Sequence, residues 1–234
     1  MGHINTRQLR HLLELDENGQ GLHDEFQALI RQVTSGGVAG KMTDPREIAV
    51  KRLWDRGFGK AVKARNFKAY LAGIPQIPAG LLADDADLPF LSLVDPRPGL
   101  LRSCKLLWIQ FEELGYAEDS SVPFDQNFPL PTGPFWFRHD NGRKNRKRRP
   151  DHCRDELTGD IQAGSAMEGI FAYAHHPDIV KKGEHVIDLP GTVRRDARVN
   201  CAYLGVWDGQ ARLSLSGDAG FANPSCGALR LRRK

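Results

Sequence analysis

The feature that most constrains the fold is a β-hairpin signal near the C-terminus. Asp208-Gly209 separates two strand-like runs, 201–207 and 210–216. Asp-Gly favours the two-residue turns that join antiparallel strands, because both positions tolerate a positive φ angle. In the second run apolar and polar side chains alternate, so one face of the predicted sheet contacts solvent. The C-terminal quarter is therefore expected to form an antiparallel sheet.

Helical patterns dominate the chain before this sheet. Apolar residues at three- and four-residue spacing predict amphipathic helices, and Asp44-Pro45 is a strong helix start with Asp44 as the N-cap. The predicted helices cover about 6–18, 22–33, 45–57, 59–71, 100–114 and 161–176. The other predicted strands are 90–94, 135–139 and 186–189, the last ended by Pro190-Gly191, and 216–228 is expected to be a loosely ordered tail.

These elements predict an α+β protein: a helical N-terminal part, then a mixed part in which a small antiparallel sheet packs on helices. The stretch 72–87 is rich in Pro, Gly and Asp and is the best internal boundary. It separates a helical region at 1–73 from an α+β region at 84–234, unless the two form one continuous domain.

Composition excludes several classes of protein. Apolar residues make up 40% of the 234 and charged residues 26%, which is usual for a folded soluble chain. No apolar run approaches the roughly 18 residues of a membrane span, and no signal region begins the sequence. The four cysteines lack close paired spacing, so neither a zinc site nor a redox motif is indicated. We expect a cytoplasmic protein without a membrane partner, metal or cofactor, since phosphate-binding glycine loops are also absent.

Positive charge is concentrated in two segments, although the net charge is only +4. Seven Lys or Arg lie between Lys51 and Lys68 against one acid, and six of the seven residues from Arg143 to Arg149 are basic. The end of the chain, 230–234, adds four more basic residues, whereas acids cluster at 84–87 and near 112–119. This polarity indicates a preference for an anionic partner.

The charge pattern predicts a non-catalytic nucleic-acid-binding protein, either alone or as a subunit of a larger complex. Six closely spaced cations are expected to form an exposed, mobile loop unless an anion holds them, and DNA or RNA phosphates are suitable anions. The block comprises Arg143, Lys144, Arg146, Lys147, Arg148 and Arg149. Upstream, Trp136 and Phe137 are candidates to stack on unpaired bases. A second contact surface is predicted at Lys60, Lys63, Arg65 and Lys68, either on a helix-turn-helix or on the solvated face of a helical hairpin.

The sequence also fits two other functions, a module that binds an acidic protein and a hydrolase or nuclease. The basic block can serve as a docking site for an acidic protein, or it can be an ordinary solvated loop. A hydrolase or nuclease would need His152, Glu168, His175 or Asp178 to converge in one cleft. Glu168 and His175 are the catalytic candidates, but they lie seven residues apart on a predicted helix. A histidine at a helix C-terminus is also explained by the helix dipole alone.

Overall fold

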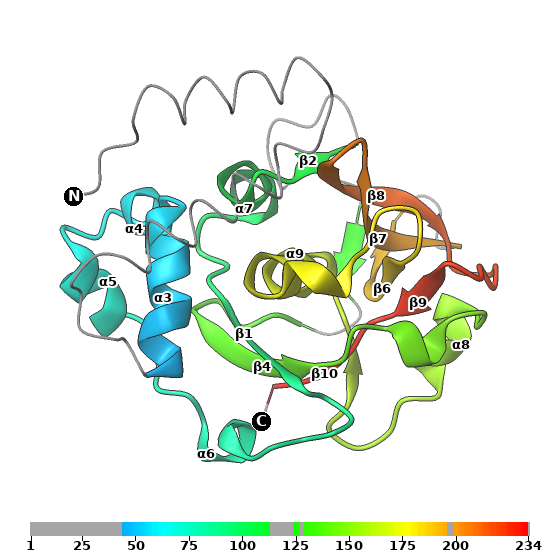
Figure 1. The fold of residues 1–234 in the computed structure, drawn as a ribbon, viewed down its shortest axis with the longest axis horizontal. Coiled ribbons are helices and arrows are strands. Elements are labelled where there is room, and N and C mark those ends of the chain that lie inside the picture. Colours follow the sequence, from blue (N-terminus) through cyan, green and yellow to red (C-terminus); the bar gives the residue numbers. More distant parts are fainter. Residues whose placement is uncertain (1–43, 113–123, 127–128, 196–198, 234) are drawn as a thin grey trace, which may run out of the picture. The chain divides into compact units, whose positions relative to one another are not determined.

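The computed structural model describes residues 44–112, 124–126, 129–195 and 199–233. Residues Asp44–Lys234 form one compact unit, in which two β-sheets and the helices between and beside them are arranged as Figure 1 shows. The predicted α+β class is confirmed. The helices predicted near 6–18 and 22–33 lie outside the described residues, and so does the end of the helix predicted at 100–114, from residue 113 on.

The first sheet has four antiparallel strands in the order β1-β4-β10-β5. They are β1 (Phe90–Val94), β4 (Phe135–His139), β10 (Arg230–Arg232) and β5 (Gln162–Ala163). The strands predicted at 90–94 and 135–139 are thus confirmed. The last residues of the chain form an inner strand, so they belong to the fold and not to a tail.

The second sheet contains the predicted hairpin. Its order is β2-β8-β7-β6-β3, with β9 also paired to β6. The strands are β2 (Gln110–Phe111), β8 (Gln210–Asp218), β7 (Asn200–Trp207), β6 (Val186–Arg194), β3 (Phe124–Gln126) and β9 (Cys226–Ala228). Strands β7 and β8 are antiparallel with Trp207 opposite Gln210, and Asp208 and Gly209 both have positive φ, as the turn prediction required.

The sequence predicted that strand β6 would end at Pro190-Gly191, but the strand continues through these residues to Arg194. The pairing with β7 shifts register between Leu189 and Val193, so the Pro-Gly pair forms an irregularity within a longer strand. A Cβ at Gly191 would lie 2.5 Å from the Ala163 carbonyl oxygen, which explains why glycine is needed here. The predicted loose tail at 216–228 is also wrong, because β9 pairs with β6.

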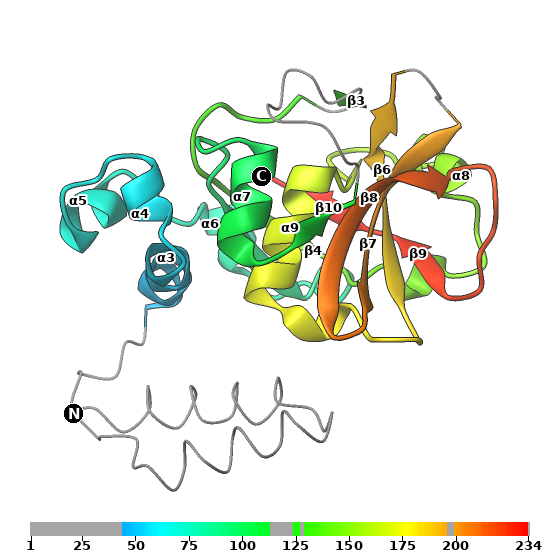
Figure 2. The same cartoon turned by 90° about the horizontal axis from the view of Figure 1, so that it is seen from above.

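Helix α9 (Ala166–His175) packs between the two sheets and also contacts α7 (Leu100–Leu107), as the two views agree (Figures 1 and 2). It begins with a capping box in which Ser165 and Glu168 satisfy each other's backbone N–H groups. A Cβ at Gly169 would lie 2.5 Å from Leu189, so glycine permits the close approach of β6. The helix starts later than predicted because Gln162–Ala163 are extended in β5.

Helix α3 (Pro45–Asp55) begins as predicted, with the Asp44 carboxylate accepting from the Arg46 N–H at 2.9 Å. The single helix predicted at 59–71 is instead two short ones, α4 (Phe58–Ala61) and α5 (Phe67–Ala72). Lys63, at φ 59°, ends α4 in the left-handed conformation, with Ala64 N–H donating to the Gly59 carbonyl. Asn66 then caps α5, so two capping signals outweigh the continuous apolar pattern.

Helix α7 ends at Leu107 and not near 114. Trp108 takes the left-handed conformation, with φ 58°, and Ile109 N–H donates back to the Cys104 carbonyl at 2.9 Å. Gln110 and Phe111 then pair with β8, so apolar residues that fit a helical stripe belong to a strand. The remaining described helices are α6 (Ala79–Leu82), α8 (Pro150–Asp155), and the 3-10 turns η2 (Arg143–Asn145) and η3 (Pro177–Ile179).

Candidate functional site

Half of the cations in the basic block 143–149 are paired with carboxylates of the same chain. The Lys144 ammonium lies 2.6 Å from Asp87, and the Arg149 guanidinium lies 2.6 Å from Asp151. Arg148 forms an ion pair with Glu156. Pairing with these cations lowers the pKa values of Asp87 and Asp151 from their ordinary range. Three of the six cations therefore already have an anionic partner.

Hydrogen bonds from side chains and from one backbone N–H of the block also connect it to Glu184 and to the segment 223–228. Arg146 donates to the carbonyl oxygens of Pro224 at 3.0 Å and Glu184 at 2.6 Å. The Asn145 side chain donates to the Ala228 carbonyl at 2.8 Å, and Lys147 N–H donates to Asn223 at 3.3 Å. The block was expected to be exposed and mobile unless an anion held it, and here carboxylates of the same chain hold three of its cations. Within the part of the chain that the structure describes, only Arg143 and Lys147 of the block lack an ion-pair partner or a side-chain hydrogen bond.

The basic C-terminus has a structural role as well. Arg230 pairs with Asp140 at 2.8 Å, Arg232 with Asp85 at 2.9 Å, and Arg233 with Glu168 at 2.7 Å. Each arginine extends from or just beyond β10 to a carboxylate that is remote in the sequence. These ion pairs connect β10 to the rest of the fold.

The aromatic residues upstream of the block are not available to a nucleic acid. Trp136 is 2% exposed and Phe137 is fully buried, because β4 lies between β1 and β10 in the first sheet. The Trp136 indole N–H donates to the Pro75 carbonyl at 3.0 Å. Stacking on a base needs an open ring face, so the prediction of base stacking by these two residues is wrong. The described aromatic residue with the most exposed side chain is Trp108, at 65%, and the Arg56 guanidinium lies 4.1 Å from its ring centre.

The second basic segment differs from the block. Lys60 lies on α4, Lys63 and Arg65 lie in the turn that follows, and Lys68 lies on α5. All four side chains are exposed, and none forms an ion pair or a hydrogen bond with a described residue. We call these residues segment 60–68.

The two basic regions do not form one continuous surface. The block leads directly into α8, and both views place α8 and the α4–α5 pair at opposite ends of the unit (Figures 1 and 2). One short stretch of nucleic-acid backbone therefore cannot contact both segment 60–68 and the block.

The catalytic candidates Glu168 and His175 have structural roles. The Glu168 carboxylate is fully buried and accepts from Ser165 N–H at 3.0 Å, Ser165 O–H at 2.9 Å and the Arg233 guanidinium at 2.7 Å. At the other end of α9, His175 Nε2 is 3.0 Å from the Leu93 carbonyl. Burial lowers the pKa of His175 to about 3, so its ring is neutral at physiological pH. The two residues do not meet, and His152 and Asp178 are exposed, so no catalytic cleft forms from this set.

The other histidines near α9 are also part of the core. His139 Nε2 lies 2.9 Å from the Ser92 hydroxyl, and its Nδ1 lies 2.7 Å from the Asp140 carbonyl. Burial lowers the pKa of His139 to about 3 and also lowers the pKa of His176. These rings pack against Phe90 as neutral aromatic groups.

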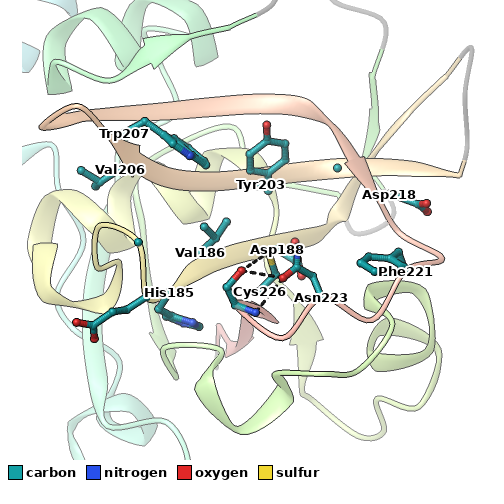
Figure 3. Close-up of a pocket in the computed structure, with 14 residues that line it drawn as sticks. His185, Val186, Asp188, Tyr203, Val206, Trp207, Asp218, Phe221, Asn223 and Cys226 are labelled. Carbon is teal, nitrogen blue, oxygen red and sulfur yellow. Dashed lines mark hydrogen bonds between the residues drawn. The ribbon is translucent and has the colours of Figure 1, made fainter.

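A pocket of about 440 Å³ opens between strands β6–β8 and the segment that leads into β9 (Figure 3). Asp188 of β6 lines it, is 7% exposed, and has no hydrogen bond or ion pair to its carboxyl group from any described residue. Desolvation alone raises the pKa of this carboxyl to about 7. A carboxyl with such a pKa and no partner is typical of binding and catalytic sites.

The sequence did not indicate Asp188 as a site residue, because an acid in a short strand is expected to contact solvent. The one sign of its burial is that it interrupts the apolar run Val186-Ile187-Asp188-Leu189, which continues as a strand. Buried thiols surround it, but burial raises the pKa of Cys226 to about 11 and also raises that of Cys201, so both stay protonated. Among the described residues, no group of three or more His, Cys, Asp or Glu side chains is placed to hold a metal ion.

No helix in the described ranges has the length and apolar character needed to cross a bilayer. Comparisons with protein-family models, with curated proteins and with solved structures found no match for this chain.

Proposed function

We propose that the chain binds the phosphate backbone of a nucleic acid through segment 60–68. The observation that supports this is the contrast in pairing between the basic segments. Lys60, Lys63, Arg65 and Lys68 are exposed and have no carboxylate partner among the described residues, whereas Lys144, Arg148 and Arg149 of the block each pair with a carboxylate. Phosphate contacts satisfy exposed cations of this kind, and they require no base-reading residues.

The irregular backbone of the segment suits contact with phosphates better than insertion in a groove. Helix α4 has four residues and α5 has six, so neither provides the long recognition helix of a helix-turn-helix protein. The four side chains instead extend from two short helices and the turn between them. Binding of this type is independent of sequence and falls steeply with salt concentration.

The test is fluorescence anisotropy with short single-stranded and duplex DNA and RNA over a salt series. Variant A carries Lys60→Gln, Lys63→Gln, Arg65→Gln and Lys68→Gln. Variant B is its matched control, with Lys144→Gln, Lys147→Gln, Arg148→Gln and Arg149→Gln, and it has the same net charge. We expect variant A to lose at least tenfold in affinity at low salt and variant B to lose much less.

Binding by the wild-type chain without a salt dependence would contradict the proposal, and so would equal losses in the two variants. The alternative, an acidic protein partner, predicts a different result. In that case a pull-down from cell extract survives nuclease treatment, and anisotropy with nucleic acid alone shows no binding.

A further inference from the structure

The pocket above β6–β8 differs in charge from the rest of the chain. The chain has a net charge of +4. The described residues that line the pocket nevertheless include three carboxyl side chains, Glu184, Asp188 and Asp218, and no Lys or Arg. Glu184 is paired with Lys181 at 2.7 Å, so the carboxyl group that makes the pocket attractive to a cation is Asp188.

The backbone of Asp188 is fixed because β6 pairs with a strand on each of its two edges. It is paired with Tyr203 on β7 and with Ala228 on β9, and its carbonyl accepts from Leu229 N–H at 3.0 Å. The backbone is thus held, while the carboxyl group, on the pocket side, has no donor or cation among the described residues (Figure 3). A buried carboxylate without such a partner is costly, so a ligand that supplies positive charge or N–H donors would bind it strongly.

His185 provides a second acceptor without a donor. Its Nε2 lies 2.6 Å from the Asn141 carbonyl, which can only accept, so the proton is on Nε2. Its Nδ1 therefore carries a lone pair, and this buried atom has no hydrogen-bond partner in the described part of the chain. Burial lowers the pKa of His185, so the ring adds no positive charge to the pocket.

Aromatic rings provide the apolar part of the pocket. Tyr203 and Trp207 both line it and are arranged edge to face, with ring centres 5.8 Å apart. The Tyr203 hydroxyl donates to Glu112 at 3.3 Å. Phe221, 59% exposed, lies on the side nearest Asp218 (Figure 3). Aromatic faces attract cations and also cover the apolar body of a ligand.

We propose that this pocket binds a small organic cation, an amine or guanidinium group on an apolar body, with Asp188 as its counter-ion. The Tyr203 and Trp207 rings contact the body of the ligand. A volume of about 440 Å³ suits a molecule of this size. This inference does not depend on the proposed nucleic-acid binding, which uses the opposite charge at a different surface.

The proposal predicts the pH dependence of binding. A cation binds the ionised form of Asp188, whose pKa is about 7, so affinity falls by up to about tenfold for each pH unit below 7 and is constant above it. The groups around Asp188 are Cys201 and Tyr203 on β7, Cys226 on β9, Cys153 and Arg154 on α8, and Glu184, His185 and Asp218 at the rim. The cations outside this lining are Lys181, which is paired with Glu184, Arg143 and Arg146 near His185, and Arg149 near Asp218. Burial keeps the three thiols protonated and His185 neutral, and Arg154 is paired with Asp155, so Asp188 dominates the titration.

The experiment is calorimetric titration of the full chain with benzylamine and phenylguanidine as cations. Benzyl alcohol and benzoate are the neutral and anionic controls of the same shape. We expect the two cations to bind more tightly at pH 8 than at pH 6, and the two controls not to bind. Asp188→Asn should lower cation affinity at least tenfold at pH 8, whereas Asp178→Asn, which removes an exposed carboxyl outside the pocket with the same change in net charge, should lower it less than threefold.

The proposal is overturned if neither cation binds at millimolar concentration, if benzoate binds as well as benzylamine, or if Asp188→Asn has no effect in a folded protein. Circular dichroism establishes that the variant is folded. If Asp188→Asn does not fold, Trp207→Leu replaces it. That variant should weaken cation binding several-fold without changing the pH dependence, and unchanged affinity there would overturn the proposal in the same way.

Discussion

The basic block 143–149 and segment 60–68 look alike in the sequence but differ in their surroundings. In the block, Lys144, Arg148 and Arg149 are paired with carboxylates, and Arg146 donates to two carbonyl groups. Segment 60–68 has no such partners among the described residues. Half of the cations in the denser cluster are therefore already paired with carboxylates of the same chain. The density of cations along the sequence does not indicate which of them lack a partner in the fold.

The largest effect is expected where a paired cation supports the fold. Arg233→Met leaves the fully buried Glu168 carboxylate without its cation, so we expect the free energy of unfolding to fall by about 3 to 5 kcal/mol. The measurement is urea unfolding. The matched control is Arg65→Met, which removes an exposed, unpaired cation and should change stability by less than about 0.5 kcal/mol. Equal losses in the two variants would remove the distinction between the two kinds of arginine.

The second largest effect is expected at Asp188, a buried carboxyl group without a cationic partner among the described residues. The pKa of Asp188 is raised to about 7 in the folded chain, above its ordinary value, so stability falls as pH rises from about 4 to about 7. Asp188→Asn removes this titration and should stabilise the chain relative to wild type by about 2 to 3 kcal/mol more at pH 8 than at pH 5. Urea unfolding at the two pH values measures it. If the difference in unfolding free energy between wild type and Asp188→Asn does not change with pH, the Asp188 carboxyl is not desolvated.

A smaller effect, on the affinity for DNA, is expected when the carboxylate partners of the basic block are removed. Asp87→Asn, Asp151→Asn and Glu156→Gln remove its three carboxylate partners. The block should then bind phosphates, and affinity for duplex DNA at low salt should rise about tenfold. Asp55→Asn, which removes a carboxylate paired with Lys51, should give a smaller increase. If the triple variant shows no increase, pairing is not what excludes the block from binding.

The smallest effect concerns Lys63 alone. Its left-handed backbone conformation suits glycine, so Lys63→Gly should cost no stability and can add up to about 1 kcal/mol. It should still weaken duplex DNA binding, with a salt slope lower by about 1. Thermal unfolding and anisotropy together separate the two results. Loss of stability would contradict the assigned helix end at Lys63.

The sequence predicted local structure better than it predicted the environment of side chains. The Asp208-Gly209 hairpin, strand 90–94 and the start of α3 follow from interactions between residues close in the chain. The breaks at Lys63 and Trp108 were missed because capping and strand pairing outweighed a continuous apolar pattern. The Lys144–Asp87 pair joins residues 57 positions apart, and no local pattern indicates it. For the same reason, the burial of Trp136 and Asp188 depends on which strands lie beside them.

The measurement that tests the central claim most directly is the salt dependence of duplex DNA affinity in variants A and B. Both variants carry the same net charge, so a difference between them reports position alone. We expect the slope of log affinity against log salt to become shallower by about 3 to 4 in variant A, and by about 1 or less in variant B. Equal changes in the two slopes, or a larger change in variant B, would contradict it.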